Sequence, residues 1–312
     1  ERNWGATIGG LNVPGIYRLQ NSVERPLIQN TTAQKQIESL FAGASFGWRS
    51  TIFLDLTGRQ DWSSTLPDGA NAYFYPSASL SYVFSEMFNI PKMSFGKFRF
   101  GWARTGNDTD PYNLYTTYVP NPNFGSLPNF TVSNTLNKID LKPENTTALE
   151  AGIDLRFFQD RLGLDVSVYQ QKTTDQIIPL ATSAASGYER QFINAGEISN
   201  RGIEISLHAV PIRTGNFSWE ATVNFDQNKN EIVSLIPDDP TFNTLVLYQP
   251  WMQYVAQVGQ PYGTILGTDF LYDNSGNRLV DPNTGFYLQT PGPVPIGNIT
   301  PDFTGGISNT FS

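Results

Sequence analysis

The chain alternates between apolar and polar residues over long stretches. Within residues 147–158, Leu149 and Ile153 fall on one side of an extended backbone, and Glu150 and Asp154 fall on the other. Side chains at this period of two point alternately to the two faces of a β-strand, so each stretch predicts a strand with one apolar and one polar face. The predicted strands are residues 38–48, 50–59, 73–86, 95–105, 147–158, 161–171, 201–210, 216–226 and 303–312.

The length of these strands favours a membrane protein over a soluble one. Most are roughly 10–13 residues long, whereas strands of globular proteins are usually about 5–6 residues long. A tilted strand needs about 9–11 residues to cross a bilayer.

Short and long connections also alternate along the chain. Tight turns are expected near Arg49, over 87–94, at Gln159–Asp160 and over 211–215. Bacterial outer-membrane barrels show this alternation, because their periplasmic turns are short and their outer loops are long. The fold class predicted is therefore all-β, an antiparallel transmembrane β-barrel. Its long outer loops are expected at residues 60–72, 106–146, 172–200 and 227–301.

Composition narrows the possible functions. The 312 residues include no Cys and one His, which disfavours disulfides, thiol catalysis and a His-based metal site. A net charge of −8 argues against nucleic-acid binding. No apolar run reaches the ~18 residues of a transmembrane helix, and the opening ERNWGATIGG does not resemble a signal peptide. Because the last predicted strand is cut off at Ser312, and an open sheet edge is not viable in a bilayer, we expect a piece of a longer polypeptide.

Several segments resemble one known family. They include YFYPSASLSYVFSE (73–86), GNDTDPY (106–112), LKPENTTALEAGIDLRFFQD (141–160), INAGEISNRGIE (193–204) and IGNITPDFTGGISNTFS (296–312). In combination these segments resemble the barrel region of SusC/RagA-type TonB-linked outer-membrane transporters of Bacteroidota. The resemblance extends from about residue 38 to the end of the chain.

The resemblance implies a bacterial outer-membrane location and a 22-stranded barrel, with an N-terminal plug domain and a TonB box that this chain does not contain. It also implies a SusD-like surface lipoprotein partner, TonB-dependent import of oligosaccharides or peptides, and a dimer of transporter–lipoprotein pairs. No cofactor and no enzymatic activity are implied.

Candidate transport residues fall into two groups. Aromatic side chains on the predicted outer loops could stack on a substrate or contact the lipoprotein, although packing between loops is the more common role of such residues. These aromatics are Trp62, Tyr112, Tyr115, Tyr118, Tyr188 and Trp251. Charged residues on the polar strand faces are expected to face the barrel lumen, because charges cost free energy in lipid. These are Glu150, Asp154, Arg156, Asp165, Glu204, Glu220 and Asp226.

Three other groups of polar residues could suggest metal binding or catalysis, but each is better explained by a structural role. His208 lacks partners for a metal site and is expected to be a lumen-facing structural residue. The segment from Asp269 to Asn277 suggests a calcium loop, but the twelfth residue from Asp269 is Val280 instead of Glu, so we expect β-turns there. Glu144, with Glu150 and Asp154, could suggest a glycosidase, but a polar barrel interior also accounts for acids.

Two alternatives to transport remain open from the sequence. A soluble or surface β-sandwich carbohydrate-binding module would suit the aromatic, Asn-rich loops, but not the long strands. An enzyme on a β-scaffold would need a convincing acid–base pair, which the sequence does not offer. A requirement for detergent would distinguish a transporter from both alternatives.

Overall fold

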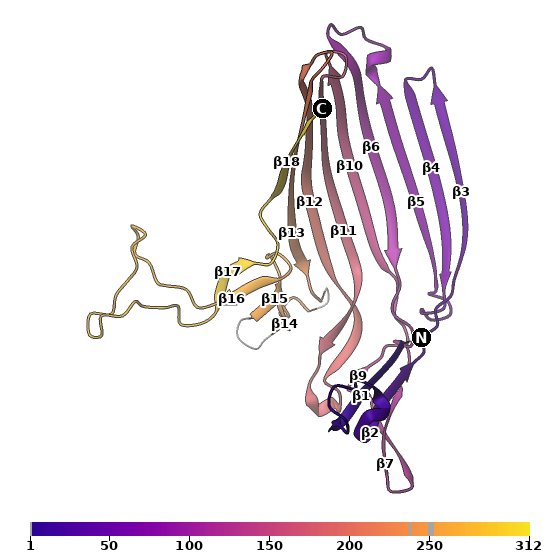
Figure 1. The fold of residues 1–312 in the computed structure, drawn as a ribbon, viewed down its shortest axis with the longest axis vertical. Coiled ribbons are helices and arrows are strands. Elements are labelled where there is room, and N and C mark those ends of the chain that lie inside the picture. Colours follow the sequence, from indigo (N-terminus) through magenta and orange to yellow (C-terminus); the bar gives the residue numbers. More distant parts are fainter. Residues whose placement is uncertain (1, 237–238, 249–252) are drawn as a thin grey trace.

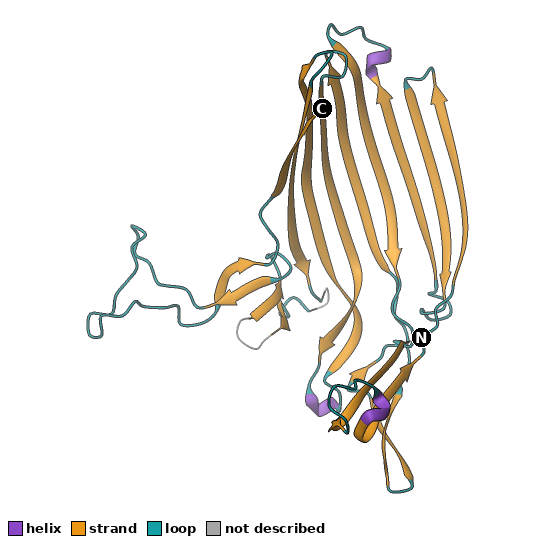
Figure 2. Ribbon diagram, viewed as in Figure 1, coloured by secondary structure: helices purple, strands orange, loops and turns teal. Residues whose placement is uncertain are grey.

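The computed structural model describes residues 2–236, 239–248 and 253–312. Its regular structure is almost entirely β-strand, and in these ranges helix is confined to single 3₁₀ turns (Figure 2): η1 (Leu19–Asn21), η2 (Phe84–Glu86) and η3 (Ala184–Ser186). None of the described helices is long and apolar enough to cross a membrane. The all-β antiparallel fold class expected from the alternation is confirmed.

Long strands lie side by side in one large antiparallel sheet, drawn vertically in Figure 1. In chain order they are β3 (Ile37–Trp48), β4 (Ile52–Ser63), β5 (Ala72–Val83), β6 (Met93–Asn107), β10 (Glu144–Phe157), β11 (Leu162–Ala181), β12 (Arg190–Arg213), β13 (Ser218–Ser234) and β18 (Thr304–Phe311). The order in space follows the order along the chain. Short β9 (Thr135–Leu136) adds in parallel to β12 at Arg190.

The register gathers the polar positions of neighbouring strands on one side of the sheet. Asp154 pairs with Asp165, Asp165 with Ser206, and Ser206 with Asn224. We call this side the polar face and the opposite side the apolar face. One row of the apolar face runs through Leu155, Leu164, Leu207, Val223 and Ile307.

The apolar face is exposed instead of forming a core. Leu149 is 45% exposed, Val168 is 48% exposed and Ile307 is 73% exposed. On β10 the apolar positions run from Leu149 to Phe157, about 26 Å at ~3.3 Å per residue, close to the apolar band of about 25 Å on outer-membrane barrels. A contiguous exposed apolar surface of this size indicates contact with another apolar phase.

Several strands are longer than predicted. The predicted loop 172–200 is mostly strand, because β11 continues to Ala181 and β12 begins at Arg190. Here Lys172 Nζ forms an ion pair with Glu197 Oε1 at 2.8 Å. Both residues occupy apolar-face positions beyond the apolar band. Beyond the band, charged residues occupy apolar-face positions, so the alternation that identified the strand disappears while its hydrogen bonds continue.

The other predicted loops also contain strands, gathered at the lower end of the sheet in Figure 1. Predicted loop 106–146 holds a hairpin of β7 (Tyr118–Phe124) and β8 (Leu127–Val132), and the N-terminal segment forms a hairpin of β1 (Arg2–Leu11) and β2 (Ser22–Thr31). Predicted loop 227–301 begins as the end of β13 and then forms a four-stranded sheet. That sheet consists of β14 (Thr244–Tyr248), β15 (Gln253–Gln257), β16 (Thr264–Gly267) and β17 (Val294–Asn298).

Smaller differences occur at the strand ends. The predicted strand 50–59 begins later, at Ile52, because Arg49 and Ser50 form the turn with φ of 50° and 53°. The predicted strand 73–86 ends at Val83, where η2 begins. Predicted loop 60–72 is shorter than expected, since β4 continues to Ser63.

Candidate functional site

The polar face carries a row of charges, and Arg99 holds the best-ordered part of it. The Arg99 guanidinium donates to both Asp165 oxygens, with each N–O distance 2.6 Å, and Nη2 also donates to Ser167 Oγ at 2.6 Å. Glu150 lies 4.0 Å from Arg99 Nε. Because β10 separates β6 from β11, Arg99 reaches across a whole strand to bind Asp165.

Gly152 makes this reach possible. Gly152 is the register partner of both Arg99 and Ser167, so it lies between them on β10. A Cβ atom at Gly152 would come within 2.6 Å of Arg99 Nε. Because glycine has no side chain, it leaves the space over β10 that the Arg99 guanidinium occupies.

The remaining predicted lumen residues lie on this same face. Glu204 and Asp226 are direct register partners, and these two like charges make the electrostatic potential of the face more negative. Arg156 lies 3.6 Å from Asp154, and Arg213 lies 3.9 Å from Glu220. The structure thus brings Glu150, Asp154, Arg156, Asp165, Glu204, Glu220 and Asp226 together on one face.

His208 takes part in the same face as a strand residue. Its Nδ1 lies 3.3 Å from Thr222 Oγ1 on β13, and its backbone pairs with Gly163. Among the described residues, no group of three or more His, Asp or Glu side chains is arranged to hold a metal ion. Asp273, in the candidate calcium segment, accepts hydrogen bonds from the backbone N–H groups of Ser275 and Asn277, which is a turn arrangement.

The carboxylates considered for catalysis do not converge. Glu144 Oε1 accepts a hydrogen bond from the Ile177 N–H at 2.9 Å, at the start of β10. Glu150 and Asp154 occupy the polar-face positions on either side of Gly152, where each contacts an arginine. These contacts give each carboxylate a structural role in the sheet.

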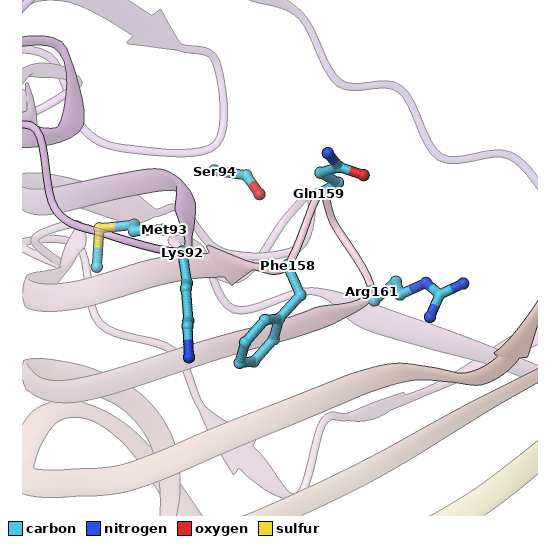
Figure 3. Close-up of a pocket in the computed structure, with 6 residues that line it drawn as sticks. All are labelled: Lys92, Met93, Ser94, Phe158, Gln159 and Arg161. Carbon is cyan, nitrogen blue, oxygen red and sulfur yellow. The ribbon is translucent and has the colours of Figure 1, made fainter.

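The short-turn end of the sheet has an open cavity of about 630 Å³. Figure 3 shows its lining residues Lys92, Met93, Ser94, Phe158, Gln159 and Arg161. The Phe158 N–H donates to the Lys92 carbonyl at 2.8 Å, and the Asp160 N–H donates to Ser94 Oγ at 3.2 Å. These bonds tie two neighbouring turns together, so the cavity is a gap between turns.

At the opposite end, Asp108 joins three strand ends. Its buried carboxylate pairs with Lys35, accepts a hydrogen bond from Ser63 Oγ, and accepts another from Thr65 Oγ1 at 3.1 Å. Burial alone would raise the pKa of Asp108, but the hydrogen bonds from Lys35 and Ser63 outweigh it and hold the pKa below its usual value. Asp108 is therefore a charged anchor for the outer loops.

An apolar cluster packs beside this anchor. It consists of Leu66, Tyr73, Leu114 and Leu141, with Ile177 and Phe192 against it. Asn194 adds a polar connection, because its amide bonds to both the N–H and the carbonyl of Lys142. The long connections are thus packed onto the sheet instead of extending freely from it.

The predicted substrate aromatics are spread over this end of the molecule. Tyr112, Tyr115 and Tyr118 are strongly exposed, at 56%, 62% and 71%. Tyr188 is half-buried and lies in the connection from β11 to β12. Trp62 lies in β4 on the apolar-face side, instead of in a loop. Trp251 lies outside the described residues.

Three important residues were not among the predicted site residues. The alternation around Phe98 and Phe100 does place Arg99 on the polar face, but its contact with Asp165 spans 66 residues and depends on strand register. The role of Gly152 also depends on strand register, because the register places it beside Arg99. Asp108 lies three residues after the predicted strand 95–105, in a predicted loop, and nothing in the sequence identifies Lys35 as its partner.

Comparison with known proteins agrees with this architecture. The family described as TonB dependent receptor-like, beta-barrel matches residues 3–304. TonB-dependent receptor P26 of Formosa agariphila is 28% identical over 96% of this chain, and the aligned region is 32% of that protein. TonB-dependent receptor SusC of Bacteroides thetaiotaomicron is 28% identical over 64% of this chain, which corresponds to 21% of SusC.

Solved structures show the same fold. The RagAB peptide transporter structure superposes with a TM-score of 0.78 at 21% identity, covering 94% of this chain and 33% of the matched chain. The chain thus spans about a third of the length of TonB-dependent receptor P26 and of the matched RagAB chain. Taken with the exposed apolar band and the charged polar face, the match shows that this chain belongs to the TonB-dependent receptor-like β-barrel family of Gram-negative outer-membrane proteins.

Proposed function

We propose that the protein imports oligosaccharides or peptides across the outer membrane in a TonB-dependent manner. The observation that carries this proposal is the two-sided sheet, in which an exposed apolar face backs a continuous charged face. In a barrel, such a sheet places the apolar face against lipid and the polar face in the aqueous lumen.

The charged residues of the polar face then form the wall of the transport path. Asp165 and Glu150 neutralise Arg99, whereas Glu204 and Asp226 are adjacent acids, so the wall is acidic toward β13. Transport requires no nucleophile or metal, and the polar side chains of this face supply hydration and hydrogen bonding instead.

The outer end is the proposed region for recognition. The exposed rings of Tyr112, Tyr115 and Tyr118 provide flat surfaces for a substrate or for a SusD-like surface lipoprotein. Tyr188 and Trp251 remain candidates for the same role, whereas Trp62 lies on the apolar-face side of β4. A plug domain and a TonB box, carried by other parts of a full-length protein with 22 barrel strands, would supply energy coupling.

Uptake by cells carrying the full-length protein tests this function. Uptake of labelled oligosaccharides and peptides should require both the transporter gene and TonB, and a protonophore should abolish it. Retention of uptake after loss of TonB would contradict the proposal. Equal uptake with and without the transporter gene would also contradict it.

A further inference from the structure

A second cavity, of about 340 Å³, lies at the outer end of the large sheet. It lies between the extended ends of β11, β12 and β13 and the separate small sheet, from which β14, β15 and Tyr262 contribute lining residues. These elements lie in the lower half of Figure 1. A buried cluster of Ile232, Leu235 and Ala256 joins the two sheets beside it. Its volume is within the usual range of small-ligand sites, about 300–1,000 Å³.

Part of the wall of this cavity lies on the polar face, which is the proposed lumen surface. Its lining residues Ile198 and Ile232 are register partners, and an unbroken ladder leads from them to the pair of Glu204 and Asp226. The separation is six residues on each strand, an even number, so both pairs share the polar face. A substrate that enters along this face meets the cavity at its outer end.

The lining of the cavity is aliphatic. Its apolar wall includes Ile178, Ile198, Ile232, Leu235, Leu245 and Val246. Sugars bind through the flat faces of aromatic rings and through planar polar groups, and here Tyr262 is the one aromatic residue among the described lining residues. A branched aliphatic side chain matches this wall better than a sugar ring.

One cation lies at the edge of this apolar wall. Arg190 lines the cavity, is exposed to solvent, and makes no ion pair within 4.0 Å among the described residues. Its backbone position is fixed by pairing with Thr135 of β9. A guanidinium with unused donors binds a carboxylate in preference to a neutral group.

We propose that this cavity binds peptides that end in an aliphatic residue, with the side chain in the cavity and the terminal carboxylate on Arg190. This inference rests on the proposed function and narrows its substrate class to peptides. Gln176 and Ser234, which also line the cavity, provide hydrogen bonds for the peptide backbone.

Calorimetry on the full-length transporter, purified from outer membranes with any lipoprotein that copurifies, tests this site. The probes are an alanine tetrapeptide ending in leucine, the same peptide with an amidated C-terminus, and maltohexaose. We expect the free-acid peptide to bind, and amidation to weaken it at least about tenfold through loss of the charge-assisted bonds. Equal binding of acid and amide, or binding of maltohexaose alone, would overturn the assignment.

Variants locate the binding within the cavity. Arg190→Gln should weaken the free acid at least about tenfold while leaving the weaker amide unchanged, and Arg190→Lys should retain part of the affinity. Val246→Trp, at a position 45% exposed, should weaken both peptides by narrowing the cavity. Arg25→Gln, which removes an exposed cation away from the cavity lining, is the matched control and should change neither.

The outcomes separate this inference from the proposed function. Heat-modifiable migration on gels establishes that each variant has folded, and binding is compared only among folded forms. Peptide binding that is insensitive to both Arg190→Gln and Val246→Trp overturns the inference, even if uptake still depends on TonB. Loss of TonB dependence overturns the proposed function instead.

Discussion

Arg99 binds Asp165 through two parallel hydrogen bonds of 2.6 Å, although the two residues are on strands that are not neighbours. The guanidinium lies over Gly152 of the intervening strand β10. A bidentate pair in this position restrains the relative placement of three strands. Glycine at position 152 is therefore explained by the side chain that crosses it.

Replacing this glycine should displace the arginine. In Gly152→Ala the new Cβ would lie 2.6 Å from Arg99 Nε, so the guanidinium must move and the bidentate pair is lost. We expect a loss of about 1–2 kcal/mol in the free energy of unfolding, measured by urea titration in detergent micelles. Gly101→Ala is the matched control on β6, because a Cβ there meets nothing within 4 Å, and it should not destabilise. Equal losses would contradict the crossing role of Arg99.

The two faces of β11 should respond differently to substitution. Leu164→Arg places a cation on the apolar face, at a cost of about 2–4 kcal/mol near the bilayer midplane, whereas Asp165→Asn keeps a polar group on the polar face. We expect Leu164→Arg to reduce the amount of assembled barrel in outer-membrane fractions far more than Asp165→Asn does. Similar yields for the two variants would mean that the faces are assigned incorrectly.

The Asp108 anchor should be insensitive to mild acid. Because its folded-state pKa lies below the unfolded value of about 3.9, its contribution is complete above that value and is lost only as the pH falls through the lower, folded pKa. Hydrogen exchange in residues 64–71 and 108–117 should therefore show equal protection at pH 7 and pH 5. Asp108→Asn should raise exchange at both pH values. Loss of protection in the wild type already at pH 5 would show that this pKa is raised instead of lowered.

The turn between β3 and β4 is a site for stabilisation. Arg49 and Ser50 both have positive φ, a conformation that costs most residues about 1–2 kcal/mol and that glycine adopts freely. Ser50→Gly should therefore raise the free energy of unfolding by about 1 kcal/mol in the same titration. Ser81→Gly, within strand β5, should lower it instead. A lower free energy of unfolding for Ser50→Gly would contradict the claim that the positive φ of Ser50 strains this turn.

The sequence predicts those features of the fold that alternation controls. Wherever one strand face contacts an apolar phase, as from Leu162 to Val168, period two is enforced and the strand can be identified. Beyond Gln170 this constraint ends, so the continuation of β11 to Ala181 could not be predicted. The sheet of β14 to β17 has short strands and contacts that depend on tertiary packing, and it gives no comparable signal.

The candidate site also has a part that the alternation predicts and a part that depends on strand register. Which residues share the polar face follows from parity alone, so Glu150, Asp165 and Glu204 could be grouped before any register was known. Which of them touch depends on how strands slide past one another, and this determines the pairing of Arg99 with Asp165. The Arg190 cavity requires two sheets to meet, which period-two patterns do not specify.

The central claim is that the polar face of this sheet meets water while the apolar face meets lipid. Residues 1–312 contain no cysteine. In a full-length protein freed of any cysteine elsewhere, single cysteines can be introduced at neighbouring exposed positions of β13 and spin-labelled in the membrane. Val223→Cys should give a label that collides mainly with oxygen, which partitions into lipid, and Asn224→Cys one that collides mainly with a water-soluble nickel chelate. Reversed accessibilities, or water access at both positions, would contradict the account.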